Sequence, residues 1–337
     1  MKKLQSQLVE LLKIHGISGD EKPVREYLIP QLTKFMDMVK VDDYGNLLGE
    51  KRVGSGEGAT ILLSAHMDTV RGVLKNRKIV YKNGTLTSNK GALGADDRAG
   101  IAIILAVLRN INKTSFNGTI KVAFSREEEV GCIGSTNIDK DFYKDSDLAI
   151  VVDRKGNRDI VVGCGYAFCS DSVGVFMEDV AKMADMSDWR CVEGGVSDAM
   201  TFSGGGVNSV NLSAGYRFEH TEKEYVSIAD MKDTVRLILQ VFGVINTFYK
   251  TFDSLTFENR WIKNWDYGYS RGDSNYHYSN KYFEDVFEDD VWAEEYDANG
   301  DVYVYEVGKD IVIQQGTQEI LLSRVSLRNL LKQLKNV

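Results

Sequence analysis

Apolar positions in the first 250 residues follow two alternating spacings. Leucines at helical spacing predict a helix over 4–14, and a proline suited to a first helical turn predicts another over 23–35. Short continuous apolar runs predict buried strands at 60–65, 119–125, 147–153 and 207–213. Helical periodicity lies between or after them, over 96–110, 174–186 and 228–250. Alternating strands and helices predict an α/β fold, with a mostly parallel central sheet and helices on both faces.

The character of the sequence changes near residue 251. From there to 301 the chain is rich in tyrosine, tryptophan and acid, and positions 284–301 hold nine acidic residues and no basic one. Strand-like runs follow, and then leucines at helical spacing from Ser326. We therefore predict a large domain over 1–250, an acidic connecting segment over 251–301, and a small β-hairpin plus helix module over 302–337.

Composition and charge narrow the classes of protein. No apolar run approaches the roughly 20 residues that span a bilayer, and the first 16 residues lack the unbroken apolar region of a secretory signal. The four cysteines show neither metal-site nor disulfide spacing, so we expect reduced thiols and a cytoplasmic protein. A net charge of −8 disfavours nucleic acid and anionic membranes as partners.

Polar side chains follow the predicted strands, where ligands bind in open parallel sheets. In chain order these are His66, Asp68, Asp96, Asp97, the run Glu127 to Glu129, Asp153 and, after a further loop, His220. Each has a simpler explanation alone: a structural histidine, a helix-capping aspartate pair or a solvated acidic surface. Their gathering at one end of the sheet favours a divalent-metal site instead, because a cation removes the repulsion between adjacent carboxylates.

Several segments recur in the order found in one superfamily. The chain resembles the co-catalytic dinuclear zinc exopeptidases of clan MH, which include peptidase T, carboxypeptidase G and the deblocking and leucine-releasing bacterial aminopeptidases. The resemblance spans about residues 4–248. It is carried by ISGDEKPVREYL (17–28), VDDYGNLLG (41–49), LLSAHMDTV (62–70), LGADDRAGIA (93–102), EEEVGCIGS (127–135), VVD (151–153), GGVSDAMTF (194–202) and HTEKEYV (220–226).

The resemblance implies a set of metal ligands. His66 and Asp153 would hold one zinc, Glu129 and His220 the other, and Asp96 would bridge the two. The cofactors would be two Zn²⁺, with Co²⁺ or Mn²⁺ as alternatives. The superfamily's fold would be the α/β architecture that the periodicity predicts.

The resemblance also implies roles around the metals. Glu128 would be the general base, and Asp68 would orient His66 by accepting its second ring N–H. Asp97 would follow a cis peptide bond after the bridging Asp96. Asp198 matches a motif that lines the substrate pocket in relatives, with a purely structural turn as the alternative.

The implied activity is a zinc-dependent exopeptidase. Two cations would lower the pKa of a shared water toward about 7, so that hydroxide attacks the peptide while Glu128 moves the proton. We expect an aminopeptidase acting on short peptides. An N-acyl amino acid amidohydrolase or carboxypeptidase on the same centre and a non-catalytic metal-binding relative are the alternatives.

Two spacings depart from relatives that carry an inserted domain. Asp153 and His220 are 67 positions apart, which leaves no room for the dimerisation and lid domain of peptidase T and carboxypeptidase G. His66 and Asp96 are 30 positions apart, which leaves none for the inserted domain of the deblocking aminopeptidases. We therefore expect a catalytic core without a lid, and the oligomeric state stays open.

Overall fold

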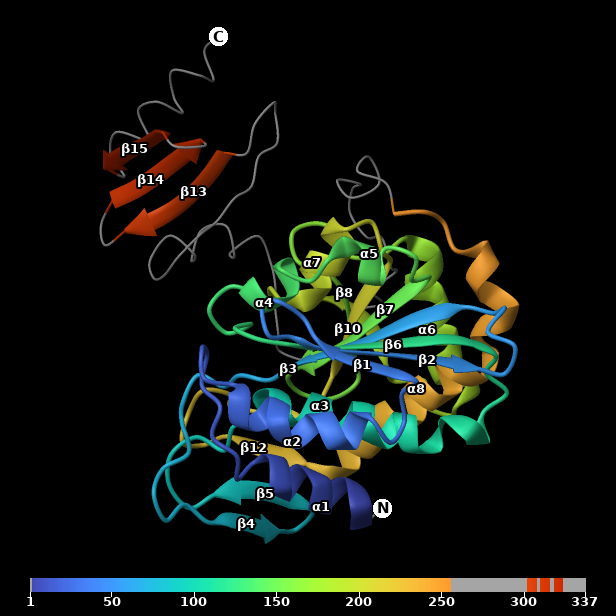
Figure 1. Ribbon diagram of the computed structural model, residues 1–337, viewed down its shortest axis with the longest axis horizontal. Helices are drawn as coiled ribbons and strands as arrows, with labels where there is room; N and C mark the ends of the chain where they lie inside the picture. Colours follow the sequence, from blue (N-terminus) through green and yellow to red (C-terminus); the bar gives the residue numbers. More distant parts are fainter. Residues whose placement is uncertain (1, 256–301, 308–309, 316–317, 324–337) are drawn as a thin grey trace. The chain divides into compact units, whose positions relative to one another are not determined.

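The computed structural model describes residues 2–255 and three strands within 302–323 (Figure 1). The chain divides into two compact units, Met1–Asn264 and Trp265–Val337. The predicted boundary near 251 precedes this division by about a dozen positions, and the predicted domain functions stay predictions. Most of the acidic segment and the helix expected from Ser326 lie outside the described residues.

An eight-stranded sheet forms the centre of the first unit (Figure 1). The four neighbours β6, β3, β7 and β10 are parallel, as are β8 and β9, whereas the pairs β1–β2, β2–β6 and β10–β8 are antiparallel. The predicted mostly parallel sheet is confirmed. Across the sheet the strands are β1 (Met38–Val41), β2 (Leu47–Val53), β6 (Gly118–Ser125), β3 (Thr60–His66), β7 (Leu148–Arg154), β10 (Ser209–Ser213), β8 (Asp159–Gly163) and β9 (Arg190–Glu193).

Helices cover both faces of this sheet (Figure 1). The central helix α3 (Ala95–Asn110) is buried from residue 95 to 108, because it packs against β3 and β7 on one side and against α1 and α8 on the other. A separate apolar cluster, which includes Leu62, Val151 and Phe202, fills the opposite face beneath α5 and α7. The other helices are α1 (Lys2–Leu11), α2 (Lys22–Leu32), α4 (Ile133–Thr136), α5 (Lys140–Tyr143), α6 (Asp171–Met183), α7 (Asp198–Gly204) and α8 (Ile228–Phe248), with short 3-10 turns at Ile111–Lys113 and Tyr249–Thr251.

The predicted helices and strands of this unit recur with ends shifted by up to three residues. The first helix ends at Leu11 instead of 14, and α6 begins at Asp171 because Ser170, in extended conformation, precedes it. No helix within residues 2–255 is both long enough and apolar enough to cross a membrane.

A second, four-stranded sheet was not predicted. Its order is β11 (Tyr216–Arg217), β12 (Tyr225–Ser227), β5 (Thr85–Ser88) and β4 (Ile79–Lys82), all antiparallel. These strands are two to four residues long and half-exposed, so apolar periodicity is weak in them. The signal that finds the hairpin is Asn83-Gly84, a two-residue turn in which both residues have positive φ.

This small sheet brings two candidate ligands to the main sheet. Asp96 follows β5 at the start of α3, and His220 lies between β11 and β12. The intervals that contain inserted domains in some relatives are thus filled by β4 and β5 in one case and by elements from β8 to β11 in the other.

The second unit contains a three-stranded antiparallel sheet of β13 (Val302–Val307), β14 (Asp310–Gln315) and β15 (Gln318–Ser323). In its register Val304 pairs with Ile313, and Ile313 with Ile320. This region was predicted to contain a two-stranded β-hairpin, whereas the structure has three strands.

Candidate metal centre

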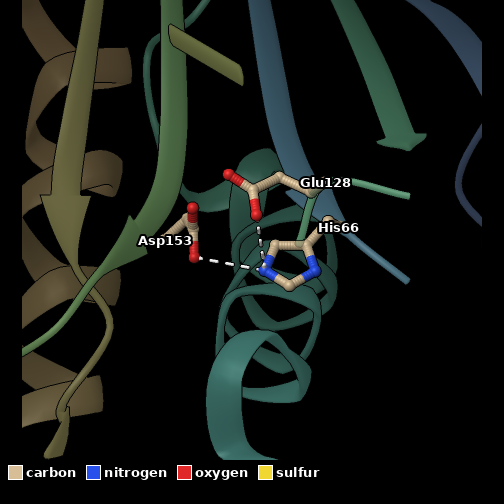
Figure 2. Close-up of side chains that lie close together, drawn as sticks. All are labelled: His66, Glu128 and Asp153. Atoms are coloured by element: carbon tan, nitrogen blue, oxygen red, sulfur yellow. Dashed lines mark ion pairs between the residues drawn. The ribbon is translucent and has the colours of Figure 1, made fainter. Parts of the chain in front are cut away.

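Three parallel strands bring candidate side chains together at their carboxyl ends. His66 is the last residue of β3, Asp153 lies near the end of β7, and β6 runs directly into the loop that carries Glu128 and Glu129. The strands β6, β3 and β7 are neighbours, so these ends meet. Figure 2 shows the side chains of His66, Glu128 and Asp153 directed at one another.

His66 is 1% exposed and turns one ring nitrogen into this cluster. Its Nε2 lies 3.1 Å from Asp96 Oδ1, 3.4 Å from Asp153 Oδ1 and 3.9 Å from Glu128 Oε2. The first half of the centre therefore comprises one imidazole nitrogen and three carboxylates.

His220 forms the second half of the centre with the other oxygen of the same aspartate. Its Nε2 lies 3.2 Å from Asp96 Oδ2 and 2.8 Å from Glu129 Oε2. Asp96 thus directs one oxygen toward each histidine, and each histidine has a further carboxylate of its own, Asp153 or Glu129.

The donor chemistry of these residues fits divalent cations. Ligand atoms of His66, Asp96 and Glu129 lie within 4.8 Å of one another, and so do those of Asp96, Asp97 and Asp153. Glu129 Oε1 is buried without a hydrogen-bond partner in the described part of the chain. No lysine or arginine among residues 2–255 forms an ion pair with Asp96, Glu129 or Asp153. Buried carboxylates without a cationic side chain require another source of positive charge.

Burial and neighbouring carboxylates shift the pKa values of several groups in this centre. Burial raises the pKa of Asp153 to about 7 and, together with the charge of Asp153, raises the pKa of Glu128. Hydrogen bonds to Asp96 and Glu129 raise the pKa of His220 to about 10. These shifts favour protons on Asp153, Glu128 and His220, which bound cations would displace.

Asp68 connects the histidine to the loop of the two glutamates. Its Oδ1 accepts from His66 Nδ1 at 3.2 Å and from the Glu128 N–H at 3.0 Å. Its Oδ2 accepts from the Ser18 hydroxyl at 2.7 Å and from the Glu129 N–H at 3.2 Å. Although burial opposes ionisation, the hydrogen bond and charge of His66 lower the pKa of Asp68 to about 2. One carboxylate thus holds the imidazole and both glutamates in place.

Asp96 and Asp97, at the start of α3, differ in the groups that their carboxylates contact. The peptide bond between them is cis, and neither residue has helical backbone angles. Asp97 accepts the N–H of Gly100 at 2.9 Å, as a helix cap does, and the N–H of His66 at 3.3 Å. The capping explanation therefore describes Asp97, whereas Asp96 lies between the two histidines.

Asp198, at the start of α7, is buried and accepts a hydrogen bond from Ser125 at 2.5 Å. Burial raises the pKa of its carboxyl, and its charge in turn raises the pKa of Glu128. Asp198 does not line the small cavity that Asp96, Glu129, His220 and Glu224 form with neighbouring residues. Assignment of Asp198 to the substrate pocket stays a prediction.

Sequence reasoning missed Tyr216, Asn211 and Ser18, and it interpreted Cys132 as a buried structural thiol, with a soft metal ligand as the alternative. The Tyr216 hydroxyl donates to Asp153 Oδ1 at 3.0 Å and to its carbonyl at 2.7 Å, and Asn211 Oδ1 accepts the Asp153 N–H at 2.9 Å. Ser18 contacts Asp68, and Cys132 donates its thiol to Glu128 Oε1 at 3.5 Å. Ser18 and Cys132 lie in segments that carry the family resemblance, whereas Tyr216 and Asn211 had no such signal.

Comparisons with known proteins show which class of protein the chain resembles. The sequence profile of the M42 glutamyl aminopeptidase family matches residues 71–237. A candidate aminopeptidase of Acetivibrio thermocellus is 22% identical over 330 residues, which cover 70% of this chain and 98% of that protein. A tripeptidase of Staphylococcus aureus shares the fold with a TM-score of 0.64 at 18% identity, over 73% of this chain and 98% of the other. Aminopeptidase PepT of Bacillus cereus gives a TM-score of 0.62 at 19% identity, over 72% and 98%.

The M42 match and the aminopeptidase among the relatives indicate a metallo-exopeptidase, and the α/β fold carries a cluster of carboxylates and histidine at its strand ends that fits this class. The chain is similar in sequence to the M42 glutamyl aminopeptidases over residues 71–237, as its resemblance to the dinuclear zinc exopeptidases leads one to expect.

Proposed function

We propose that this protein is an aminopeptidase that removes residues from the free amino end of short peptides, using two Zn²⁺. The observation that supports it most directly is the placement of Asp96, whose two carboxylate oxygens face His66 and His220 separately. His66 and Asp153 would hold one ion, Glu129 and His220 the other, and Asp96 would bridge them. The aminopeptidase names among the relatives and the matching M42 profile support the choice of substrate.

The bound metal pair would supply a water of lowered pKa and polarise the scissile carbonyl. Glu128 would accept a proton there, which is supported by the 3.9 Å between its Oε2 and His66 Nε2 and by the hydrogen bond of its backbone N–H to Asp68. Burial and the charge of Asp153 raise the pKa of Glu128, which makes it a stronger base and later a donor to the leaving amine. Asp68 engages His66 Nδ1, so that Nε2, which faces Asp96, is the nitrogen that would hold the metal.

We further propose that the protein works in the cytoplasm and that short peptides, not nucleic acid or membranes, are its partners. All four cysteines are free thiols, two of which, Cys132 and Cys169, are 1% exposed. The net charge of −8 disfavours polyanionic partners. Sedimentation would determine the oligomeric state.

Metal analysis combined with a substrate panel tests the function. The panel contains free peptides, N-blocked and C-blocked peptides, and N-acyl amino acids. About two zinc per chain and cleavage only of peptides with a free amino end are expected. Cleavage only of N-acyl amino acids, or only of peptides with a free carboxyl end, would replace this proposal with a deacylase or a carboxypeptidase. Bound metal without any hydrolysis would indicate a binding protein.

A further inference from the structure

Glu224 is a buried acidic side chain for which the proposed mechanism has no use. It is 1% exposed and lies directly before β12, four residues after His220. Its Oε2 accepts the N–H of Gly94 at 2.7 Å. Its Oε1 accepts the N–H of Ala95 at 2.7 Å and that of Asp96 at 3.1 Å. A single carboxylate therefore binds three consecutive backbone N–H groups.

These three N–H groups need an acceptor from outside the helix. They precede or begin α3, where N–H groups have no carbonyl of the preceding turn to bind. Asp96 and Asp97 have non-helical backbone angles, so the backbone here is not held by the helix itself. Burying a carboxylate is costly unless hydrogen bonds compensate, and here three charge-assisted bonds do so.

Glu224 joins two ligand-bearing segments that are far apart in the sequence. The segment that it holds ends in Asp96, whose Oδ2 lies 3.2 Å from His220 Nε2. Pairing of Tyr225 with Thr87 brings β12 to β5 and so brings Glu224 to this segment. Arg77 binds the carbonyls of Ala92 and Leu93, just before it, at 2.8 and 2.9 Å.

We propose that Glu224 is a positioning residue for the metal bridge: its carboxylate holds the backbone of residues 94–96 where Asp96 can reach both metals. The inference rests on the proposed dinuclear function. The hydrogen bonds that the structure gives the Glu224 carboxylate all go to backbone N–H groups, so it is expected to act through the backbone that carries Asp96.

Substitution of Glu224 tests this inference by metal affinity. In Glu224→Gln one oxygen becomes an amide that faces an N–H donor, and in Glu224→Asp the carboxylate is one methylene shorter. Glu222→Gln is the matched control, because Glu222 lies on the same segment and is exposed. Zinc affinity is measured by chelator competition, the Co²⁺ form by its visible spectrum, and folding by thermal unfolding of the metal-free proteins.

A folded Glu224 variant is expected to bind the more weakly held of the two zinc ions about 10 to 100 times less tightly than the wild type and to show an altered Co²⁺ spectrum. Glu222→Gln is expected to match the wild type in both measurements. Two metals held with wild-type affinity and spectrum in the folded variants would overturn the inference. If neither Glu224→Gln nor Glu224→Asp folds without metal, the inference is also overturned, because Glu224 would then be needed for folding and not for positioning Asp96. Failure of the proposed function is seen separately, as a wild-type protein that binds no metal or cleaves no peptide.

Discussion

Replacement of Asp68 by asparagine isolates the contribution of one carboxylate that supports the whole centre. Asp68 accepts four hydrogen bonds, two on each oxygen. An asparagine of the same shape has a single acceptor oxygen, and its amide group must face one of the two pairs of donors.

The structure indicates which orientation of the asparagine amide loses fewer hydrogen bonds. With the amide group in place of Oδ2, the Ser18 hydroxyl can reverse and accept, so only the Glu129 N–H loses its acceptor. With the amide group in place of Oδ1, the His66 ring N–H and the Glu128 N–H both lose theirs. The first orientation is therefore expected, at a cost of about 1–3 kcal/mol in the metal-free protein.

The metal-bound protein is expected to lose more. Without the carboxylate charge, the hydrogen bond that orients His66 weakens, and loss of such a partner lowers metal affinity by about 10–100-fold. At saturating zinc this removes a further 1.4 to 2.8 kcal/mol or so from the free energy of unfolding, because each tenfold in affinity is about 1.4 kcal/mol.

Urea unfolding with and without zinc measures both quantities. Asp147→Asn is the matched control, because Asp147 accepts the Thr60 N–H at the opposite end of β3 and an amide oxygen can keep that single bond. Its zinc-dependent stabilisation is expected to equal that of the wild type. If Asp68→Asn shows the same zinc-dependent stabilisation as Asp147→Asn, the reasoning about Asp68 is wrong.

Three further predictions concern the centre itself. Glu128→Gln is expected to keep both metals while kcat falls by about 10²–10⁴-fold, and loss of metal instead would show that Glu128 is a ligand. His220→Ala is expected to lower the zinc content measured by elemental analysis, whereas His15→Ala, at a half-exposed site beside Asp20, leaves it unchanged. In the metal-free protein, hydrogen bonds to Asp96 and Glu129 raise the pKa of His220 from 6.5 to about 10, so this stabilisation is complete below pH 6.5 and is lost as the pH rises toward 10. Thermal unfolding of the metal-free wild type should therefore occur at a lower temperature at pH 10 than at pH 6.5, more so than in His220→Ala, and equal pH dependence in both would refute the assignment.

Local sequence patterns determined the four parallel strands β6, β3, β7 and β10 of the main sheet and the five longest helices, but not β1, β2, β8 and β9. Apolar runs such as 60–65 become strands because burial on both faces selects continuous apolar residues, and this constraint acts on each segment by itself. Helix ends moved by up to three residues, because they depend on capping contacts that apolar spacing does not record. The small sheet escaped prediction because strands such as β4 are half-exposed, and only Asn83-Gly84 marks the turn.

The residue types of the centre were also readable from the sequence. His66, Asp153 and the glutamates follow apolar strands, and the ends of parallel strands meet, so their approach follows from the fold class. Their assignment to two metals came from the family resemblance and stays a prediction, and the structure places Asp96 between the two histidines.

Only the tertiary structure decided how the centre is supported. Tyr216 reaches Asp153, and Glu224 reaches the backbone of residues 94–96, across 63 and 128 to 130 positions of the chain. Periodicity shows that a side chain is buried, but not which distant donor or acceptor it meets. That choice depends on the pairing of β5 with β12 and of β7 with β10, which forms only when the whole chain has folded.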